Sequence, residues 1–307
     1  MKNIHHDPHV VEPTSTHTHT LIILHGRGSN GPKFGSALLE SPSTTQALTL
    51  PALIPGLKII CPTAAKRRST VLKRVPIHQW FDIYSLVDPS EREDLQLDGL
   101  KETAAYVRSL IEIESRNIPS ERIFLGGLSQ GCAAAVFVLL TLEGRLGGFI
   151  GMSGWFPLVR HVLDVLERPA GTNRTLNDDM DGDDDDDPFE TEAGESLSPP
   201  LQALNLLRGY IDMDPLDPDE STTSSVLQTP VLLGHGELDD KVDCCLGRQM
   251  ANALKSLSMD VEFMAYAGLG HWYKVPEQVQ DIAVFLLGNM TKSGNQRANS
   301  CTDQAIP

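Results

Sequence analysis

Short apolar runs and longer amphipathic segments alternate along most of this chain. The apolar runs predict strands at residues 20–24, 57–61, 123–125, 148–152, 231–233 and 261–265. Several of these runs are continuous, as expected of strands buried on both faces of a sheet. The amphipathic and alanine-rich segments predict helices at residues 99–115, 130–142, 158–167, 243–256 and 277–287. Strands that alternate with helices are typical of a mainly parallel, doubly wound sheet with helices on both faces. The expected fold class is therefore α/β, in a single domain.

One segment interrupts this alternation, at about residues 171–229. Between Glu167 and Ser225, 17 Asp and Glu against 3 Lys and Arg account for −14 of the net charge of −16, so the rest of the chain is nearly neutral. Like charges at this density repel one another and bury little apolar surface, which predicts a disordered insertion. Its aspartate run lacks the Gly and Glu positions of an EF-hand loop, so a calcium site is not predicted.

Three leucines inside the insertion stand apart from its acidic composition. Leu201, Leu204 and Leu207 have helical spacing and predict a short amphipathic helix over residues 201–210. Two placements are open for it, as a lid over a site or as a turn packed against the core.

The ends of the chain and its cysteines suggest no secretion. Residues 1–16 are expected to be poorly ordered, residues 17–290 to form the interrupted domain, and residues 291–307 to form a flexible tail. There is no basic-then-apolar leader, and no run reaches the roughly 20 apolar residues of a membrane span. The five cysteines have no zinc-ligand spacing and are expected to be reduced thiols. We therefore expect a cytoplasmic protein, with the nucleus as a second compartment.

The most informative motif lies where a predicted strand passes directly into a predicted helix. Residues 127–131 read Gly-Leu-Ser-Gln-Gly, a Gly-x-Ser-x-Gly pentapeptide centred on Ser129. In this layout the serine occupies a sharp strand-to-helix turn with its hydroxyl exposed, and the glycines avoid collisions across the turn. Ser129 is the predicted nucleophile.

A serine hydroxyl needs a base to take its proton and an acid to hold that base. With a nucleophile of this kind the chain order is Ser, then Asp or Glu, then His. Of the ten histidines, only His271 follows the acidic candidates, in a glycine-rich turn after the strand at 261–265. The acid is expected in the loop after the strand at 231–233, where Asp239 and Asp240 compete and Glu237 comes third.

The oxyanion of the tetrahedral intermediate needs backbone donors. One is the N–H of the residue after the nucleophile, here Gln130, and the other comes from the loop after an early strand. The glycine-rich segment at residues 25–28 directly follows the strand at 20–24 and meets that requirement. As a phosphate cradle it would need Gly-Lys-Ser/Thr or the full dinucleotide spacing, and it has neither. A nucleotide site is therefore disfavoured, and nucleic acid is not an expected partner.

Several further blocks, in order along the chain, resemble the acyl-protein thioesterase and lysophospholipase-like carboxylesterase family of α/β-hydrolases. These blocks are Leu-His-Gly-Arg-Gly at 24–28, Gln-Trp-Phe-Asp at 79–82, Gly-Gly-Leu-Ser-Gln-Gly at 126–131, Ser-Gly-Trp-Phe-Pro at 153–157, His-Gly-Glu-Leu-Asp at 235–239 and Gly-His at 270–271. Together they cover most of the chain outside the insertion. The Gln after the serine and the Trp-Phe-Asp block make the resemblance specific.

The resemblance implies an α/β-hydrolase fold and hydrolysis of esters or thioesters through an acyl-serine, with no metal and no organic cofactor. The reacting residues that it implies are Ser129 as nucleophile, His271 as base, Asp239 as acid, and the backbone amides of Arg27 and Gln130 as oxyanion donors. Asp239 is favoured because it and Val242 fit the family's His-Gly-x-x-Asp-x-x-Val pattern. From the aromatic blocks we expect Trp80, Trp155 and Phe156 to bind substrate.

The chain also departs from the family pattern. Arg27 stands where the family commonly has an apolar residue beside the acyl channel, and its charge argues against a long lipid chain as substrate. Cys132 occupies a position often held by glycine, which is a small change. The acidic insertion has no counterpart in compact family members.

A basic segment precedes Trp80 and borders the site in this family. It carries Lys66, Arg67, Arg68, Lys73 and Arg74. One interpretation is a solvated basic loop. The other is a docking surface for the acidic insertion, which would then cover the site through a salt-sensitive attraction.

These observations together predict a serine hydrolase of carboxylic esters or thioesters, with S-acylated proteins and lysophospholipids as candidate substrates. An esterase for small soluble esters shares the mechanism and would suit Arg27. A non-catalytic binding protein on the same fold is the alternative from another class. Acyl length and oligomeric state stay open.

Overall fold

A seven-stranded sheet forms the centre of the computed structural model, which describes residues 6–85, 87–168, 197–217 and 225–300. The strand order is β1-β3-β2-β6-β7-β8-β9, and every neighbouring pair is parallel except β1 with β3. The strands are β1 (His9–Val11), β2 (His19–Leu24), β3 (Leu57–Cys61), β6 (Ile123–Leu128), β7 (Gly148–Met152), β8 (Val231–Gly236) and β9 (Val261–Tyr266). All residues of β2, β6, β7 and β8 are buried, as their uninterrupted apolar runs predict.

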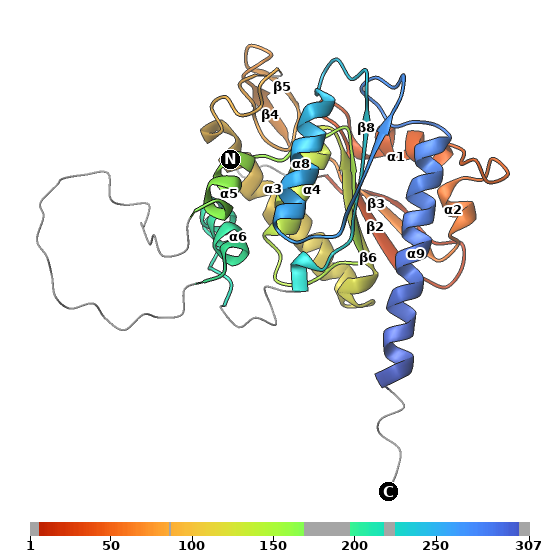
Figure 1. The fold of residues 1–307 in the computed structure, drawn as a ribbon. Helices are drawn as coiled ribbons and strands as arrows, with labels where there is room; N and C mark the ends of the chain where they lie inside the picture. The colour runs from red at the N-terminus through yellow and green to blue at the C-terminus, as the bar shows by residue number, and fades with distance from the viewer. Residues whose placement is uncertain (1–5, 86, 169–196, 218–224, 301–307) are drawn as a thin grey trace, which may run out of the picture.

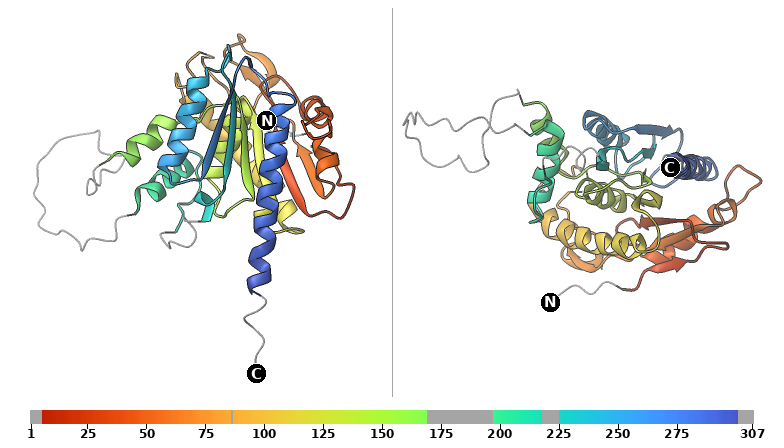
Figure 2. Two further views of the ribbon diagram at one scale, coloured as in Figure 1. Left: turned by 45° about the vertical axis from the view of Figure 1, so that its right-hand side comes forward. Right: turned by 90° about the horizontal axis from the view of Figure 1, so that it is seen from below.

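Helices cover both faces of this sheet (Figures 1 and 2). One face carries α1 (Gly31–Glu40), α2 (Leu50–Leu53) and α9 (Glu277–Ser300). The other carries α3 (Asp94–Ser115), α4 (Gln130–Leu140), α5 (Val159–Leu166), α6 (Pro199–Gly209) and α8 (Cys244–Ser256). Every residue of α4 is buried, because this alanine-rich helix lies between the sheet and the outer helices α3 and α6. The α/β fold expected from the sequence is therefore confirmed.

The two ends of the chain are more structured than the sequence suggested. His9 to Val11 lie within the segment expected to be poorly ordered, yet they form β1 and pair with residues 59–61 of β3. At the other end α9 continues to Ser300, although a flexible tail was expected from residue 291. β1 forms because its backbone pairs with β3, a long-range contact that local composition does not reveal. Residues 301–307 lie outside the described part.

The expected acidic insertion is too long at its C-terminal end. Within it, α6 forms where the leucine spacing predicted a helix, and Leu201, Leu204 and Leu207 are buried against α5 and α4. The Arg208 guanidinium donates to the carbonyl of Thr141 over 2.6 Å, which ties α6 to the end of α4. This helix therefore packs on the core rather than covering the site as a lid. The aspartate run at 183–187 lies outside the described residues.

The basic segment before Trp80 forms a hairpin of β4 (Lys66–Ser69) and β5 (Val75–His78), seen at the top of Figure 1. Arg67 forms an ion pair with Glu102 of α3. Asp82 accepts hydrogen bonds from the Thr70 amide and hydroxyl, at 2.9 and 2.6 Å. The hairpin is thus fixed to the domain, whereas its suggested partner in the insertion lies outside the described residues. No helix in the described ranges combines the length and apolarity needed to span a bilayer.

Candidate active site

Ser129 occupies the turn between β6 and α4. Its backbone has φ of 57° and ψ of −124°, a conformation that residues other than glycine rarely adopt. A Cβ on Gly127 would lie 2.3 Å from the carbonyl carbon of Gly131, and one on Gly131 would lie 2.4 Å from the carbonyl oxygen of Leu24. Both contacts are with backbone, which cannot move aside as a flexible side chain does. The two glycines therefore allow the turn to close against β2 and hold the serine in a strained position.

The structure brings Ser129, His271 and Asp239 together from three separate loops. The Ser129 hydroxyl lies 2.9 Å from Nε2 of His271, and Nδ1 of His271 lies 2.7 Å from Oδ2 of Asp239. A carboxylate only accepts hydrogen bonds, so Nδ1 of His271 carries the proton. Nε2 then presents its lone pair to the serine hydroxyl, which is the tautomer that a general base requires.

The Asp239 carboxylate is buried and fully hydrogen-bonded. Its Oδ1 accepts from the amides of Lys241 and Val242, each at 2.9 Å, while Nε2 of His235 lies 3.3 Å from Oδ2. Burial alone would raise the pKa of Asp239, but the hydrogen bonds from His235, His271 and the two amides outweigh it and hold the pKa well below its usual range. The carboxylate is therefore charged at neutral pH.

The other acidic candidates do not reach the histidine. Asp240 is exposed and forms an ion pair with Lys241 over 3.0 Å. The Glu237 side chain is also exposed, and the Glu237 amide donates to the carbonyl of Tyr266. The geometry thus selects Asp239 from the three candidates.

The loops that carry Asp239 and His271 are tied to each other. The Leu238 amide donates to the carbonyl of Leu269 over 2.9 Å. A Cβ on Gly236 would lie 2.3 Å from that same carbonyl oxygen, so the loops meet where no side chain fits. The Ser153 hydroxyl at the end of β7 donates to the carbonyl of Trp272 over 3.0 Å. These contacts set the imidazole position relative to Ser129.

Arg27 and Gln130 both line the cavity beside Ser129, as their expected role requires. In the described residues neither main-chain amide has a hydrogen-bond acceptor in the protein. The loop that holds Arg27 is fixed on its far side, because the Gly28 amide donates to the carbonyl of His78 over 2.7 Å. Two free N–H groups next to the serine are the arrangement that an oxyanion needs.

The side chain of Gln130 has a separate structural function. Its Oε1 accepts from the Trp80 amide at 3.0 Å, and its Nε2 donates to the Phe81 carbonyl at 2.8 Å. The Trp80 indole N–H in turn donates to the carbonyl of His25 over 2.7 Å. Gln130 thereby connects the start of α4, through the Trp80–Phe81 segment, to the loop before Arg27.

His25 completes this connection as a neutral imidazole. Its Nδ1 donates to the carbonyl of Gly26 over 2.7 Å, and its Nε2 accepts from the Ala64 amide over 3.0 Å. Burial lowers the pKa of His25 to about 4, although the bond to Gly26 acts in the opposite direction. A proton on Nε2 would remove the acceptor of the Ala64 amide, so the hydrogen bonds of the folded structure require a neutral His25 imidazole.

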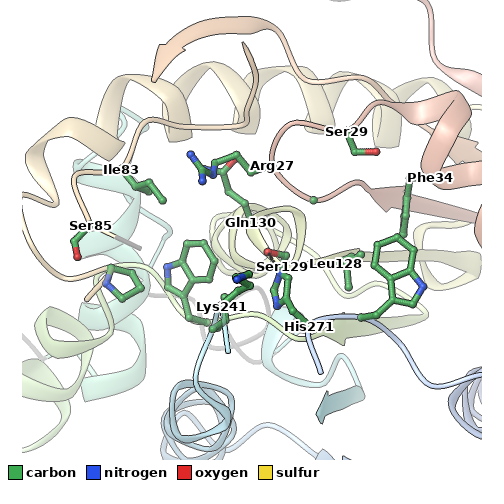
Figure 3. A pocket seen from close by; sticks show the side chains of 15 residues that line it. Arg27, Ser29, Phe34, Ile83, Ser85, Leu128, Ser129, Gln130, Lys241 and His271 are labelled. Atoms are coloured by element: carbon green, nitrogen blue, oxygen red, sulfur yellow. Dashed lines mark hydrogen bonds between the residues drawn. The ribbon is translucent and has the colours of Figure 1, made fainter. Parts of the chain in front are cut away.

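The cavity at Ser129 has a volume of about 260 Å³, and Ser129 and His271 lie near its middle (Figure 3). Ile83 and Ser85 lie toward one end of the cavity and Phe34 toward the other. Its lining residues are Gly26, Arg27, Ser29, Phe34, Ile83, Ser85, Pro89, Leu128, Ser129, Gln130, Trp155, Lys241, Val242, His271 and Trp272.

Only one of the three aromatic residues expected to bind substrate faces this cavity. Trp155 lines it. Trp80 is 1% exposed and lies behind the loop of His25, and Phe156 is 3% exposed and contacts a smaller pocket beside Val159. Phe34, Ile83 and Trp272 line the cavity without having been singled out from the sequence, because isolated apolar residues carry no signal of their own.

Comparison with known proteins identifies the family of this chain. Residues 5–173 match the phospholipase/carboxylesterase family model, and residues 176–292 match that of the prolyl oligopeptidase family. Acyl-protein thioesterase 1 of Gibberella zeae is 30% identical over 284 residues, which cover 91% of this chain and 94% of that protein. Acyl-protein thioesterase 1 homolog 1 of Dictyostelium discoideum is 24% identical over 296 residues, covering 95% and 100%.

A solved structure extends the likeness to the fold. The crystal structure of Zea mays acyl-protein thioesterase 2 superposes with a TM-score of 0.62 at 26% identity, covering 92% of this chain and 98% of that one. The family model covers more than half of the present chain, and the fungal relative aligns over nearly its full length. This chain therefore belongs to the phospholipase/carboxylesterase family of α/β-hydrolases.

Proposed function

We propose that this protein is a serine hydrolase that cleaves carboxylic ester or thioester bonds through an acyl-serine intermediate. The observation that carries the proposal is the hydrogen-bonded chain from the Ser129 hydroxyl to His271, at 2.9 Å, and on to Asp239, at 2.7 Å, inside a cavity. Family membership supports the same reaction class, since the relatives compared above are acyl-protein thioesterases by name.

The proposed reaction follows from which atoms the site supplies. Ser129 Oγ attacks the acyl carbonyl while its proton passes to Nε2 of His271, and the amides of Arg27 and Gln130 bind the resulting oxyanion. Collapse breaks the bond to the leaving group, which takes the proton from Nε2. Water then attacks the acyl-serine carbonyl while its proton passes to Nε2, and Nε2 returns the proton to Ser129 Oγ as the acyl–oxygen bond breaks, which releases the acid and restores Ser129. Asp239 stays ionised throughout and stabilises the imidazolium.

Two substrate classes fit the site. An acyl-protein thioesterase-like activity on acyl thioesters or lysophospholipids is supported by the names of the relatives and by the apolar residues Phe34, Ile83 and Trp272 in the cavity wall. A carboxylesterase activity on small soluble esters is favoured by Arg27, which puts a guanidinium into that wall. Both use the same reacting groups.

A chain-length series of p-nitrophenyl esters and acyl thioesters, measured on wild type and Ser129→Ala, tests the proposal. We expect turnover that depends on Ser129 and labelling of this residue by a fluorophosphonate. A preference for medium or long acyl thioesters would indicate a deacylase, and turnover confined to acetyl and butyryl esters would indicate the small-ester enzyme. No turnover and no labelling would leave a binding protein on a hydrolase scaffold.

A further inference from the structure

Arg27 puts an unpaired positive charge into the wall of the cavity. Its side chain is partly buried, and within the described residues no carboxylate lies within 4.0 Å of its guanidinium. The one hydrogen bond that its side chain forms with the described part of the chain, from Nη1 to the Ser69 hydroxyl, is long at 3.4 Å. Desolvation lowers the pKa of Arg27, and the negative charge of Asp82 opposes this effect only in part. A guanidinium has five N–H donors, so most of them remain available.

Asp82, the acidic residue near Arg27, forms hydrogen bonds with other groups. Asp82 lies close enough to act on Arg27 electrostatically, but its Oδ1 accepts from the amides of Thr70 and Ile83 and its Oδ2 from the Thr70 hydroxyl. These bonds fix the loop between β5 and α3. Asp82 is thus a structural carboxylate, and the charge of Arg27 faces the cavity without a bonded counter-ion.

Lys241, the other cationic residue of the cavity wall, differs from Arg27 in its ion pairing and in its exposure. Its ammonium is paired with Asp240 over 3.0 Å, and its side chain is 63% exposed. Lys241 therefore has both solvent and an ionic partner, whereas Arg27 is partly buried and, in the described residues, forms no ion pair. Figure 3 shows the Arg27 side chain above Gln130, turned toward Ile83 and away from Phe34. The free donors of Arg27 therefore lie toward the end of the cavity at Ile83.

We propose that Arg27 binds an anionic group of the substrate, a carboxylate or a phosphate, at the Ile83 end of the cavity. The protein then selects esters or thioesters that carry a negative charge near the scissile bond. A planar guanidinium pairs with such groups through two parallel hydrogen bonds, and the pair is stronger in a partly desolvated site than in water. This inference rests on the proposed hydrolase function and narrows its substrate class.

Charge selection is measured with pairs of substrates that differ only in charge. For the acyl side, the p-nitrophenyl ester of glutarate is compared with that of its neutral monoamide. For the leaving-group side, the S-acetyl thioester of 3-mercaptopropionate is compared with that of its amide. In one arm we expect wild type to prefer the carboxylate by about 10- to 100-fold in kcat/KM, the range for one charged hydrogen-bonded contact. The arm that shows the preference identifies the part of the substrate that carries the charge.

Three variants attribute this preference to Arg27. Arg27→Leu keeps the backbone amide but removes the charge, and the preference should fall to about 1. Arg27→Lys should keep part of it. Arg68→Leu removes a neighbouring exposed charge of the hairpin and should leave the ratio unchanged. Because both substrates of a pair are measured on one preparation, the ratio does not depend on the fraction of folded enzyme.

The outcomes separate this inference from the function on which it rests. Ser129-dependent turnover with no charge preference in either arm overturns the role of Arg27 and leaves the hydrolase intact. An equal loss of preference in Arg68→Leu and Arg27→Leu would show that the preference is a general surface-charge effect, and this result also overturns the role of Arg27. Absence of any Ser129-dependent turnover overturns both proposals.

Discussion

Replacing Gln130 by alanine should destabilise the protein through the Trp80–Phe81 segment. The substitution removes the acceptor of the Trp80 amide and the donor to the Phe81 carbonyl, at 3.0 and 2.8 Å. Gln130 and Trp80 are each 1% exposed and Phe81 is fully buried, so water does not replace the lost partners. An unsatisfied buried polar group costs about 1–3 kcal/mol. For two such groups we expect the free energy of unfolding to fall by about 2–6 kcal/mol.

Urea unfolding at neutral pH measures this loss. A matched variant separates the effect of the lost hydrogen bonds from that of the lost side-chain volume. Gln130→Met nearly restores the volume but pairs neither backbone group, so it should be destabilised almost as much as Gln130→Ala. Gln249→Ala, on the partly exposed surface of α8, should change the free energy of unfolding by less than about 0.5 kcal/mol. The reasoning is refuted if Gln130→Met has wild-type stability, since the side chain would then act by filling space.

Three further predictions concern the reacting groups and their supports. Asp239→Asn should lower kcat by about 10⁴, by analogy with other Ser-His-Asp enzymes, and Asp240→Asn should leave steady-state kinetics unchanged; the reverse result would assign the wrong acid. Gly131→Ala places a Cβ 2.4 Å from the Leu24 carbonyl oxygen, so calorimetry should show a loss of about 1–3 kcal/mol. Gly209→Ala, with no atom within 4 Å of its Cβ, is the control that should show no such loss. Because the pKa of His25 is lowered to about 4 in the folded protein, the unfolded chain binds more protons below about pH 6.5. His25 should therefore remove about 2 kcal/mol of stability between pH 7 and 5, and a His25→Asn variant with the same pH dependence in urea titrations would contradict this.

The sequence alone determined those features that depend on local chain physics. Short apolar runs predicted the six parallel strands, and those of β2, β6, β7 and β8 are buried along their whole length because both faces of these strands are covered. The Gly-x-Ser-x-Gly pentapeptide predicted the turn at Ser129, because only glycine fits at Gly127 and Gly131. The chain order of serine, acid and histidine then directed attention to His271 and to the loop of Asp239 and Asp240.

Contacts between distant segments decided the rest. Asp239 and Asp240 are adjacent and chemically identical, and only the folding of their loop onto the loop of His271 buries one and exposes the other. Trp80 carries the same motif signal as Trp155, yet its indole is turned behind the His25 loop and only Trp155 reaches the cavity. The direction of the Arg27 side chain depends likewise on the hairpin that meets it at Ser69. Local pattern specifies which backbone segments form, whereas the exposure and partners of a side chain depend on long-range packing, which residue spacing does not encode.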